Sequence, residues 1–347
     1  MTSQHRHFVS LGMFIIDEFL YLDDVRNHKG RTLQEQIGGG GTYANIGARI
    51  WLPGSEIGMI VDRGHDFPMD IQERLDSYGE DMWFYRDDKS RGTTRARNTY
   101  QGDFRGFEYL TPRVRITPKD LDNTKLARPS ILHFICSPTR AGEIMSEVLD
   151  TPGWKPTSIY EPIPDRCVPG ELPALVKVLP TIDVLSPNAE EALSLLSIAS
   201  PVTKALVEQA ASRFLELGVG PNGDGAVIIR SGSLGAYITT RKLGGKWVDA
   251  FWNSDNIEQV VDVTGAGNGF LGGLAAGLYF TKDIYEAIYY ATVSASFIIQ
   301  QEGLPKLSNT VDQDGHQVEL WNHDSPERRL DVVKSANTLL ESKVNKS

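Results

Sequence analysis

Short apolar runs alternate with amphipathic, helix-like segments along most of the chain. The run over residues 7–17 predicts one buried strand that ends in Asp17. Later strand-like runs are "SEIGMIVD", "SILHFIC", "TSIYEPI", "TIDVLSPN" and "GAVIIRSG". A helix-like segment follows each of the last four except "TSIYEPI", whose connection the pattern does not define. This alternation is typical of βαβ units built around a mainly parallel sheet.

Two regions depart from this alternation. Residues 82–115 are rich in β-forming residues, and the alternation in "TTRARNTYQ" predicts paired strands. After Leu307 the chain becomes polar, and Ser325 followed by Pro326 is a typical helix start. The helix predicted there has apolar residues roughly on one face, at Leu330, Val333, Leu340 and Val344. We therefore expect a C-terminal helix that docks on the main domain.

The composition is that of an ordinary globular protein and excludes few function classes. Of 347 residues, 40% are apolar and 23% charged, and the net charge of −10 argues against a nucleic-acid-binding protein. The N-terminus lacks a secretory signal pattern, and the apolar run "GFLGGLAAGLYF" is too short for a membrane span. Cys136 and Cys167 lack metal-type spacing, which indicates reduced thiols. We expect a cytoplasmic protein without membrane or nucleic-acid partners.

The stretch "VVDVTGAGNGFLGG", residues 260–273, holds the densest candidate chemistry. A strand-like "QVV" precedes the glycine turn and a helix-like segment follows, so unpaired N–H groups at the helix start would form an anion site. A plain tight turn with a glycine-rich packing helix explains the same residues. Gly267, Gly269 and Gly272 also match the dinucleotide fingerprint G-x-G-x-x-G. A second helix rather than a strand is predicted next, which argues against that fold.

This stretch resembles the D-T-x-G-A-G-D signature of PfkB-type, ribokinase-like sugar and nucleoside kinases. Four further motifs occur in the order of that family. The matching residues are Gly12 and Asp17 at the first strand end, Gly40, Gly41 and Asn45 in G-G-x-x-x-N, Asn188 and Glu191 in N-x-x-E, and Gly232 and Gly235 on the nucleotide side. The asparagine in the last motif is similar to that of fungal maintenance-of-killer proteins of this family.

The resemblance implies a three-layer α/β/α domain, with a mainly parallel central sheet and a small β lid, over residues 1–310. Lid strands are expected near 18–36 and 82–115, and residues 311–347 form a C-terminal extension. ATP and Mg²⁺ are the implied ligands, and a sugar-like or nucleoside molecule is the implied substrate. The lid also offers a route to a homodimer, as in some relatives.

The resemblance also assigns a role to each matching residue. The substrate would be bound by Asp17, Gly40, Gly41 and Asn45. The nucleotide would be placed by Asn188, Glu191, Gly232 and Gly235, with Mg²⁺ held through water near Glu191 rather than by a protein cage. The backbone amides of Gly265, Ala266 and Gly267 would face the transferring phosphoryl group.

Asn268 is the largest departure from the family pattern, which has its catalytic Asp at this position. A neutral amide cannot accept the proton of a substrate hydroxyl, and losing a general base costs about 10²–10⁴-fold in rate. Asn268 could still orient the hydroxyl or act as a helix N-cap, and a capping box would equally explain Asn188 with Glu191. Two hypotheses stay open. One is weakened ATP-dependent phosphotransfer, and the other is a pseudokinase that acts as a binding or regulatory protein.

Further departures concern charged residues. Arg230 stands where the family usually has Thr, and Glu161 in "EPIPDR" stands for its Asp. Arg95 and Arg97 share one face of a predicted lid strand, which is either a solvated face or, if it looks into the cleft, a sign of an anionic substrate. His133 and the other histidines show no ligand spacing, and we assign them no role.

Overall fold

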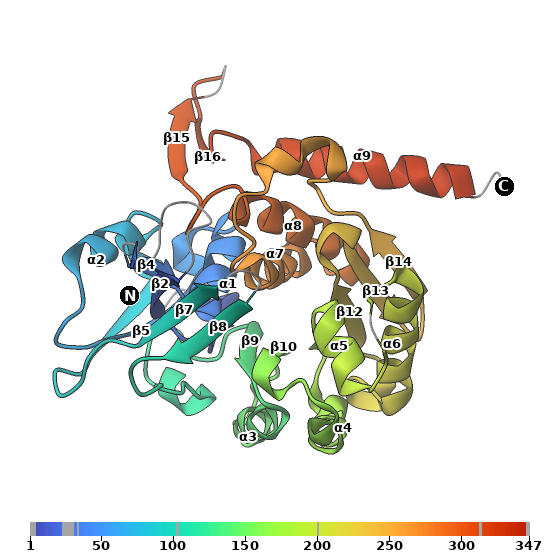
Figure 1. Ribbon diagram of the computed structural model, residues 1–347, viewed down its shortest axis with the longest axis horizontal. Coiled ribbons are helices and arrows are strands. Elements are labelled where there is room, and N and C mark those ends of the chain that lie inside the picture. Colours follow the sequence, from blue (N-terminus) through green and yellow to red (C-terminus); the bar gives the residue numbers. More distant parts are fainter. Residues whose placement is uncertain are drawn as a thin grey trace.

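The computed structural model describes residues 5–22, 31–32, 35–101, 104–199, 201–311 and 314–344. A central sheet carries helices on both faces, and a smaller sheet lies at one side (Figure 1). The strands of the central sheet, in spatial order, are β14 (Gly244–Val248), β13 (Ala236–Thr240), β12 (Ala226–Arg230), β11 (Val184–Leu185), β10 (Thr157–Pro162), β9 (Ile131–Cys136), β1 (Phe8–Ser10), β5 (Ile57–Arg63) and β6 (Trp83–Asp87).

Strands β12 to β6 of this order pair in parallel, whereas β13 and β14 are antiparallel additions at one edge. Parallel neighbours need crossover connections, and the helices supply them. One face is covered by α1 (Gly40–Arg49), α2 (Met69–Asp76), α7 (Ala266–Thr281) and α8 (Ile284–Ile298). The other face is covered by α3 (Pro138–Leu149), α4 (Leu172–Val178), α5 (Ala189–Leu195) and α6 (Lys204–Leu217). The predicted three-layer α/β/α architecture is confirmed.

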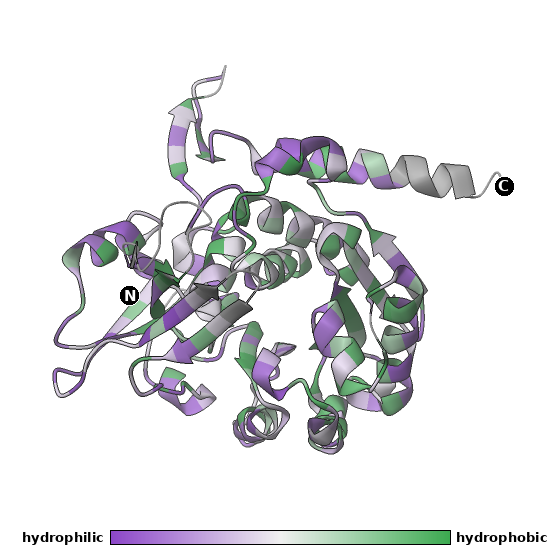
Figure 2. Cartoon of the chain, viewed as in Figure 1, coloured by the Kyte–Doolittle hydropathy of each residue, from purple (hydrophilic) through white to green (hydrophobic). Residues whose placement is uncertain are grey.

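Each central strand feeds two separate cores because successive side chains point to opposite faces of a sheet. In β12, Ile228 joins the core on the α7 side, while Val227 and Ile229 join the core on the α6 side. Burial on both faces explains why the strand sequences are continuous apolar runs rather than alternating ones. Figure 2 shows the apolar residues toward the interior and hydrophilic ones along the lid strands and outer helix turns.

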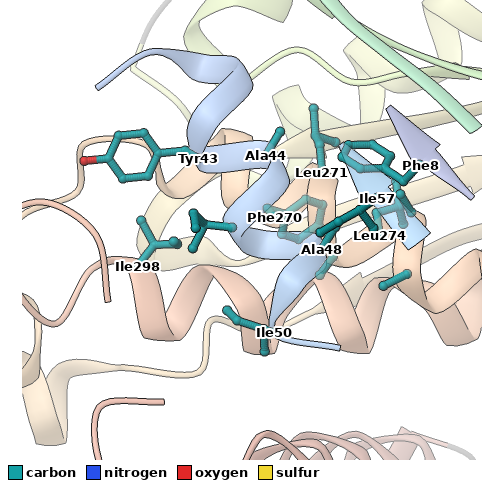
Figure 3. Close-up of a cluster of buried hydrophobic side chains, with 14 of the residues drawn as sticks. Phe8, Tyr43, Ala44, Ala48, Ile50, Ile57, Phe270, Leu271, Leu274 and Ile298 are labelled. Carbon is teal, nitrogen blue, oxygen red and sulfur yellow. The ribbon is translucent and has the colours of Figure 1, made fainter. Parts of the chain in front are cut away.

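Helices α1 and α7 approach each other backbone to backbone, and this contact positions the candidate site. A Cβ on Gly272 would lie 1.8 Å from Ala44 O, and one on Gly47 would lie 2.0 Å from Gly269 O. Figure 3 shows Ala44 and Ala48 of α1 beside the larger side chains of α7. The glycines after the candidate loop therefore serve packing, as the sequence indicated.

The smaller sheet, or lid, contains β2 (Ile15–Tyr21), β3 (Arg31–Thr32), β4 (Gln36–Gly38), β7 (Arg95–Gln101) and β8 (Phe104–Tyr109). The prediction of one strand over residues 7–17 is wrong, because β1 and β2 belong to different sheets. The chain leaves the central sheet where Gly12 meets α1, with the Cβ position of Gly12 only 2.5 Å from Gly41 N. Asp17 consequently lies inside a lid strand. Of the predicted lid, residues 23–30, 33–34 and 102–103 lie outside the described residues.

Three further expectations are corrected. Strand β6, predicted within the lid region, pairs with β5 in the central sheet. The antiparallel strand β13 follows β12 where a helix was expected, while helix α4 follows β10. The segment "QVV" is not a strand. Its first residue, Gln259, ends a 3₁₀ helix over Ser254–Gln259, and the N–H groups of Val261 and Asp262 both donate to Ile299 O.

The C-terminal part forms a hairpin, β15 (Leu307–Val311) and β16 (Gln317–Trp321), followed by α9 (Pro326–Val344). Ser325 caps α9 as predicted, accepting from the N–H of Arg328 at 3.1 Å. α9 runs along the outside of α8 (Figure 1), where the buried Arg329 donates to Ser296 Oγ at 2.8 Å. Leu330 and Val333 pack on the core, while the side chains of Leu340 and Val344 lie outside the description. Among the described helices, none is both long and apolar enough to span a bilayer.

Candidate functional site

The candidate site centres on the first turn of α7. Gly265 is the N-cap, with a left-handed φ of 75° that favours glycine, and a Cβ there would lie 2.2 Å from the Tyr43 ring. Asn268 is the third residue of the helix, so the expectation that it is an N-cap is wrong. Its side chain accepts no capping hydrogen bond, which leaves the amide available for a tertiary contact.

The backbone N–H groups of this turn are only partly used. The N–H of Ala266 donates to Val263 O at 3.2 Å. Within the described residues, the N–H groups of Gly267 and Asn268 have no protein acceptor. The side chain of Asp262, the nearest acid along the chain, accepts from the N–H of Thr264 at 2.9 Å and thus orders the loop. Free N–H groups at the positive end of a sixteen-residue helix attract an anion.

A carboxylate reaches Asn268 from a distant part of the chain. Asn268 Nδ2 donates to Glu161 Oε2 at 2.8 Å, and Glu161 lies on β10 with its side chain only 8% exposed. The other carboxylate oxygen, Oε1, lies 2.9 Å from Arg230 Nη1 at the end of β12. The site therefore holds an acid next to residue 268 although no sequence neighbour of Asn268 supplies one.

Arg230 joins Glu161 to the glycine turn. Its Nη1 is so close to Gly267 that a Cβ there would lie 1.8 Å away, and its Nη2 donates to Ser186 O at 3.0 Å. Glu191 Oε2 lies 3.7 Å from Nη2, so one guanidinium faces two buried carboxylates. Gly267 has an ordinary helical backbone, so a side chain is excluded by Arg230 rather than by backbone strain.

His133 lies behind this pair and is completely buried on β9. Its Nε2 is 3.4 Å from Glu161 Oε2, without hydrogen-bond geometry, and its Nδ1 is 2.9 Å from Ser10 Oγ. Ser10 Oγ in turn accepts from the N–H of Gly12 at 3.0 Å. These contacts connect Gly12 with Glu161 through Ser10 and His133. The spacing of histidines along the sequence could not reveal this connection.

The pKa values of Glu161 and Glu191 are shifted in opposite directions from their ordinary value. Burial raises the pKa of Glu161, but Arg230, His133 and the Asn268 amide outweigh burial and hold this pKa below its ordinary value. Burial also raises the pKa of Glu191, to about 7, and here Arg230 and the N–H of Asn188 oppose it incompletely. Glu161 is consequently ionised at neutral pH, and Glu191 is close to half-protonated.

Asn188 and Glu191 form the capping box that was the simpler interpretation of their spacing. Asn188 Oδ1 accepts from the N–H of Glu191 at 2.8 Å, and Glu191 Oε2 accepts from the N–H of Asn188 at 2.7 Å. One carboxylate oxygen of Glu191 remains for other contacts. In the described part of the chain, no group of three or more His, Cys, Asp or Glu side chains is placed to hold a metal ion.

The two nucleotide-side glycines differ in what surrounds them. Gly235 has φ 90° and a Cβ there would lie 2.1 Å from Val248 O, so the turn between β12 and β13 requires glycine. Gly232 has φ 56°, and nothing lies within 4 Å of its Cβ position. Gly232 therefore presents open backbone close to Arg230, whereas Gly235 is explained by the fold.

A cavity of about 480 Å³ meets the first turn of α7 only through Gly40, since no residue of α7 belongs to its lining. Gly12 and Gly40 line it, and a Cβ on Gly40 would lie 3.1 Å from Asn268 Nδ2. Gly41 contacts Gly12 backbone to backbone, and Asn45 is buried in α1 with its Nδ2 donating to Gly41 O at 3.0 Å. Asp17 is not part of the lining, although its Oδ2 lies against Gly38. Of the four predicted substrate-binding residues, Gly40 alone lines the cavity.

The predicted lid arginines do not line this cavity. Arg95 pairs with Glu35 and Asp66, and Arg97 pairs with Glu18 at 2.9 Å. Four other arginines line it instead, namely Arg113, Arg115, Arg140 and Arg166. Arg113 and Arg115 belong to the arginine-rich stretch of the sequence, but Arg95 and Arg97 were chosen there as the candidates. Sequence reasoning missed Arg140 and Arg166, and it also missed the contacts of Glu161, Arg230 and His133. The only signal for Glu161 and Arg230 was that each departs from a family motif.

Comparisons with known proteins show the family to which the chain belongs. The chain matches the family described as pfkB family carbohydrate kinase over residues 7–310, and it belongs to that family. It is 35% identical to Protein MAK32 of Saccharomyces cerevisiae over 320 residues, 86% of this chain and 85% of that protein. It is also 35% identical to an uncharacterised protein of Schizosaccharomyces pombe, over 94% of this chain and 92% of the other. Both resemblances inferred from the motifs, to the family and to fungal relatives, are confirmed.

Solved structures show the same ribokinase-like fold at lower identity. Anopheles gambiae adenosine kinase in complex with a di(adenosine) tetraphosphate matches with a TM-score of 0.66 and 20% identity, over 86% of this chain and 96% of that one. Arabidopsis thaliana ribokinase complexed with ribose and ATP matches with a TM-score of 0.61 and 19% identity, over 86% and 94%. These neighbours establish the kinase-type fold.

Proposed function

We propose that the protein binds ATP and transfers its terminal phosphoryl group, slowly, to a hydroxyl of a sugar-like or nucleoside molecule. The observation that carries the proposal is the first turn of α7, where the N–H groups of Gly267 and Asn268 have no protein acceptor among the described residues and the Asn268 amide lies against Gly40, a residue of the cavity lining. Membership of the pfkB family supports it, as do solved relatives that contain ATP or ADP.

Positioning and charge stabilisation are the main tasks of a phosphoryl-transfer site. The N–H groups of Gly265, Gly267 and Asn268, together with the dipole of α7, would stabilise the transferring group, and Arg230 would add a guanidinium. Ala266 would contribute the shape of the turn, and Gly232 the open backbone beside the nucleotide. Mg²⁺ bound to the nucleotide, held through water near Asn188 and Glu191, would neutralise phosphate charge.

Proton acceptance is the weak step of this site. Glu161 is the carboxylate at hand, but Arg230 and Asn268 already occupy its oxygens and its lowered pKa makes it a poor base. A base works best when its pKa is near the working pH. Transfer is therefore slow rather than absent, because positioning and charge stabilisation remain.

A second function, nucleotide binding without transfer, is favoured by one observation. Arg230 already has two carboxylates as partners and lies directly against Gly267, so part of the anion site is neutralised from within. A protein of that kind would be a pseudokinase that acts through its bound ligand or through partners. The experiments below separate the two functions.

Nucleotide binding is tested by the melting temperature with Mg-ATP and Mg-ADP, since a ligand that binds only the folded state stabilises it. A shift is expected at millimolar concentrations, and Gly267→Val should abolish it, because the side chain displaces Arg230 and covers the turn. The variant must first show cooperative unfolding. No shift with either nucleotide for the parent protein would contradict both functions.

Transfer is tested with a set of variants at residues 161 and 268, assayed with pentoses, hexoses and nucleosides. Asn268→Asp alone places a second carboxylate 2.8 Å from Glu161, and two such groups cannot both ionise freely, so little gain is expected. Asn268→Asp with Glu161→Gln keeps one carboxylate at the family position and should raise turnover by about 10²-fold or more. Asn268→Ala should bind Mg-ATP normally but lose residual transfer. A double variant that binds Mg-ATP yet is inert with every acceptor would leave the pseudokinase function.

A further inference from the structure

The cavity that Gly12 and Gly40 line has an excess of positive charge in its lining. Its four arginines come from the segment after β8, from α3 and from the segment after β10, and the only acids in the lining are Glu143 and Asp165. The lining therefore has a formal charge of +2, four arginines less two carboxylates, in a chain whose net charge is −10. A local excess opposite to the overall charge favours an anionic ligand.

The partners of these arginines show which of them are available. Arg166 is paired with Glu171, and Arg140 lies 3.6 Å from Glu143 and donates to Ile116 O at 2.9 Å. Within the described residues, neither Arg113 nor Arg115 has a carboxylate partner. Arg113 lies over the Tyr109 ring, 4.8 Å from its centroid, which orients the guanidinium without neutralising it. Two uncompensated guanidinium groups thus border one cavity.

The rest of the lining is suited to a small ring rather than to a free ion. Apolar side chains from the segment after β1, from β9 and from α3 contribute to it, including Leu11, Phe134 and Ile144. A volume of about 480 Å³ is within the usual range for small-molecule sites, about 300–1,000 Å³. Ser137 and Thr139 add hydroxyl groups at the start of α3.

We propose that the acceptor bound in this cavity is a phosphorylated sugar, whose phosphate is held by Arg113 and Arg115 while its ring lies toward Gly12 and Gly40. A phosphate monoester carries a charge of about −1.5 to −2 near neutral pH, which matches the excess of the lining better than a carboxylate does. Guanidinium groups bind such an anion through paired N–H donors. This inference rests on the proposed phosphotransfer, since it names the class of acceptor for that site.

Binding without nucleotide tests the proposal separately from phosphotransfer. Isothermal titration calorimetry would compare ribose 5-phosphate and glucose 6-phosphate with ribose, glucose, gluconate and inorganic phosphate. The phosphorylated sugars should bind at least about tenfold more tightly than the other four probes, the usual scale of one charge-assisted hydrogen bond. Arg115→Gln and Arg113→Gln should each remove most of that preference. Arg97→Gln is the matched control in the lid and should leave it unchanged, because Arg97 is paired with Glu18 outside the cavity.

Each alternative result contradicts the proposal. Equal binding of neutral and phosphorylated sugars, tighter binding of gluconate, or binding of inorganic phosphate as tight as that of the sugar phosphates would overturn it. So would an unchanged preference in folded Arg113→Gln and Arg115→Gln proteins, or no binding of any probe. The melting shift with Mg-ATP is measured on the same samples, so loss of the acceptor class and loss of the nucleotide site are distinguishable.

Discussion

Two groups of arginine, Arg230 on β12 and the cavity-lining pair Arg113 and Arg115, differ in how their charge is balanced. The side chain of Arg230 is 11% exposed and faces the carboxylates of Glu161 and Glu191. Arg113 and Arg115 are exposed at the mouth of a cavity and lack carboxylate partners among the described residues. A buried cation must be paired inside the protein, whereas an exposed one is stabilised by water until a ligand arrives. The first group therefore maintains site geometry, and the second is available for recognition.

Removal of Arg230 should give the largest effect on stability. Arg230→Met leaves two buried carboxylates without their cation, and breaking a buried pair in this way costs about 3–5 kcal/mol. Urea denaturation followed by tryptophan fluorescence measures the loss. The control is Arg213→Met, whose exposed pair with Glu216 should contribute no more than about 1 kcal/mol.

If Arg230→Met is no more destabilising than the control, the ion pairs of Arg230 with Glu161 and Glu191 do not stabilise the fold. The proposed difference between Arg230 and the cavity arginines would then be wrong. Adding Glu161→Gln should recover part of the loss, because it removes one of the unpaired charges. A double variant less stable than Arg230→Met alone would argue that Glu161 has another stabilising partner.

Glu191 should make a smaller contribution that depends on pH. Its pKa is about 7 in the folded protein against an ordinary 4.5, so the folded state holds the proton more tightly. The contribution of Glu191 to the free energy of unfolding is therefore fully present below pH 4.5. This contribution falls by about 3 kcal/mol as the pH rises from 4.5 toward 7. Glu191→Gln keeps the capping box, because Gln serves equally at that position, and should lack this part of the slope.

The measurement is urea denaturation at intervals from pH 4.5 to 7.5. Glu190→Gln, at the exposed neighbouring position, is the control and should keep the slope of the parent protein. An identical slope for Glu191→Gln would show that the buried carboxylate is compensated in full by Arg230 at all these pH values.

Arg115→Gln should have the smallest effect on stability. An exposed side chain without ion pairs contributes within about 0.5 kcal/mol, so the free energy of unfolding in urea should match the parent. A loss above about 2 kcal/mol would place Arg115 with Arg230 as a structural charge, and the distinction between the two groups would no longer hold.

The sequence by itself determined the features that depend on local contacts. The glycine turn before α7, the capping box of Asn188 with Glu191, the Ser325 start of α9 and the βαβ alternation all follow from residues within a few positions of each other. Family motifs added the correct fold because their order along the chain reflects the order of the elements. Where local pattern was ambiguous, as over residues 7–17, the same reasoning joined two strands that belong to different sheets.

Tertiary structure alone decided what surrounds Asn268. His133, Glu161 and Arg230 lie on β9, β10 and β12, which are far apart along the chain. In the central sheet these strands run parallel, with β9 next to β10 and only β11 between β10 and β12. Parallel pairing brings such side chains together, and no spacing in the sequence records which strands are neighbours. The same holds for the cavity arginines, which three separate segments contribute. The amide at residue 268 is thus explained by its bond to Glu161, because folding places an ionised carboxylate where a second one would be repelled.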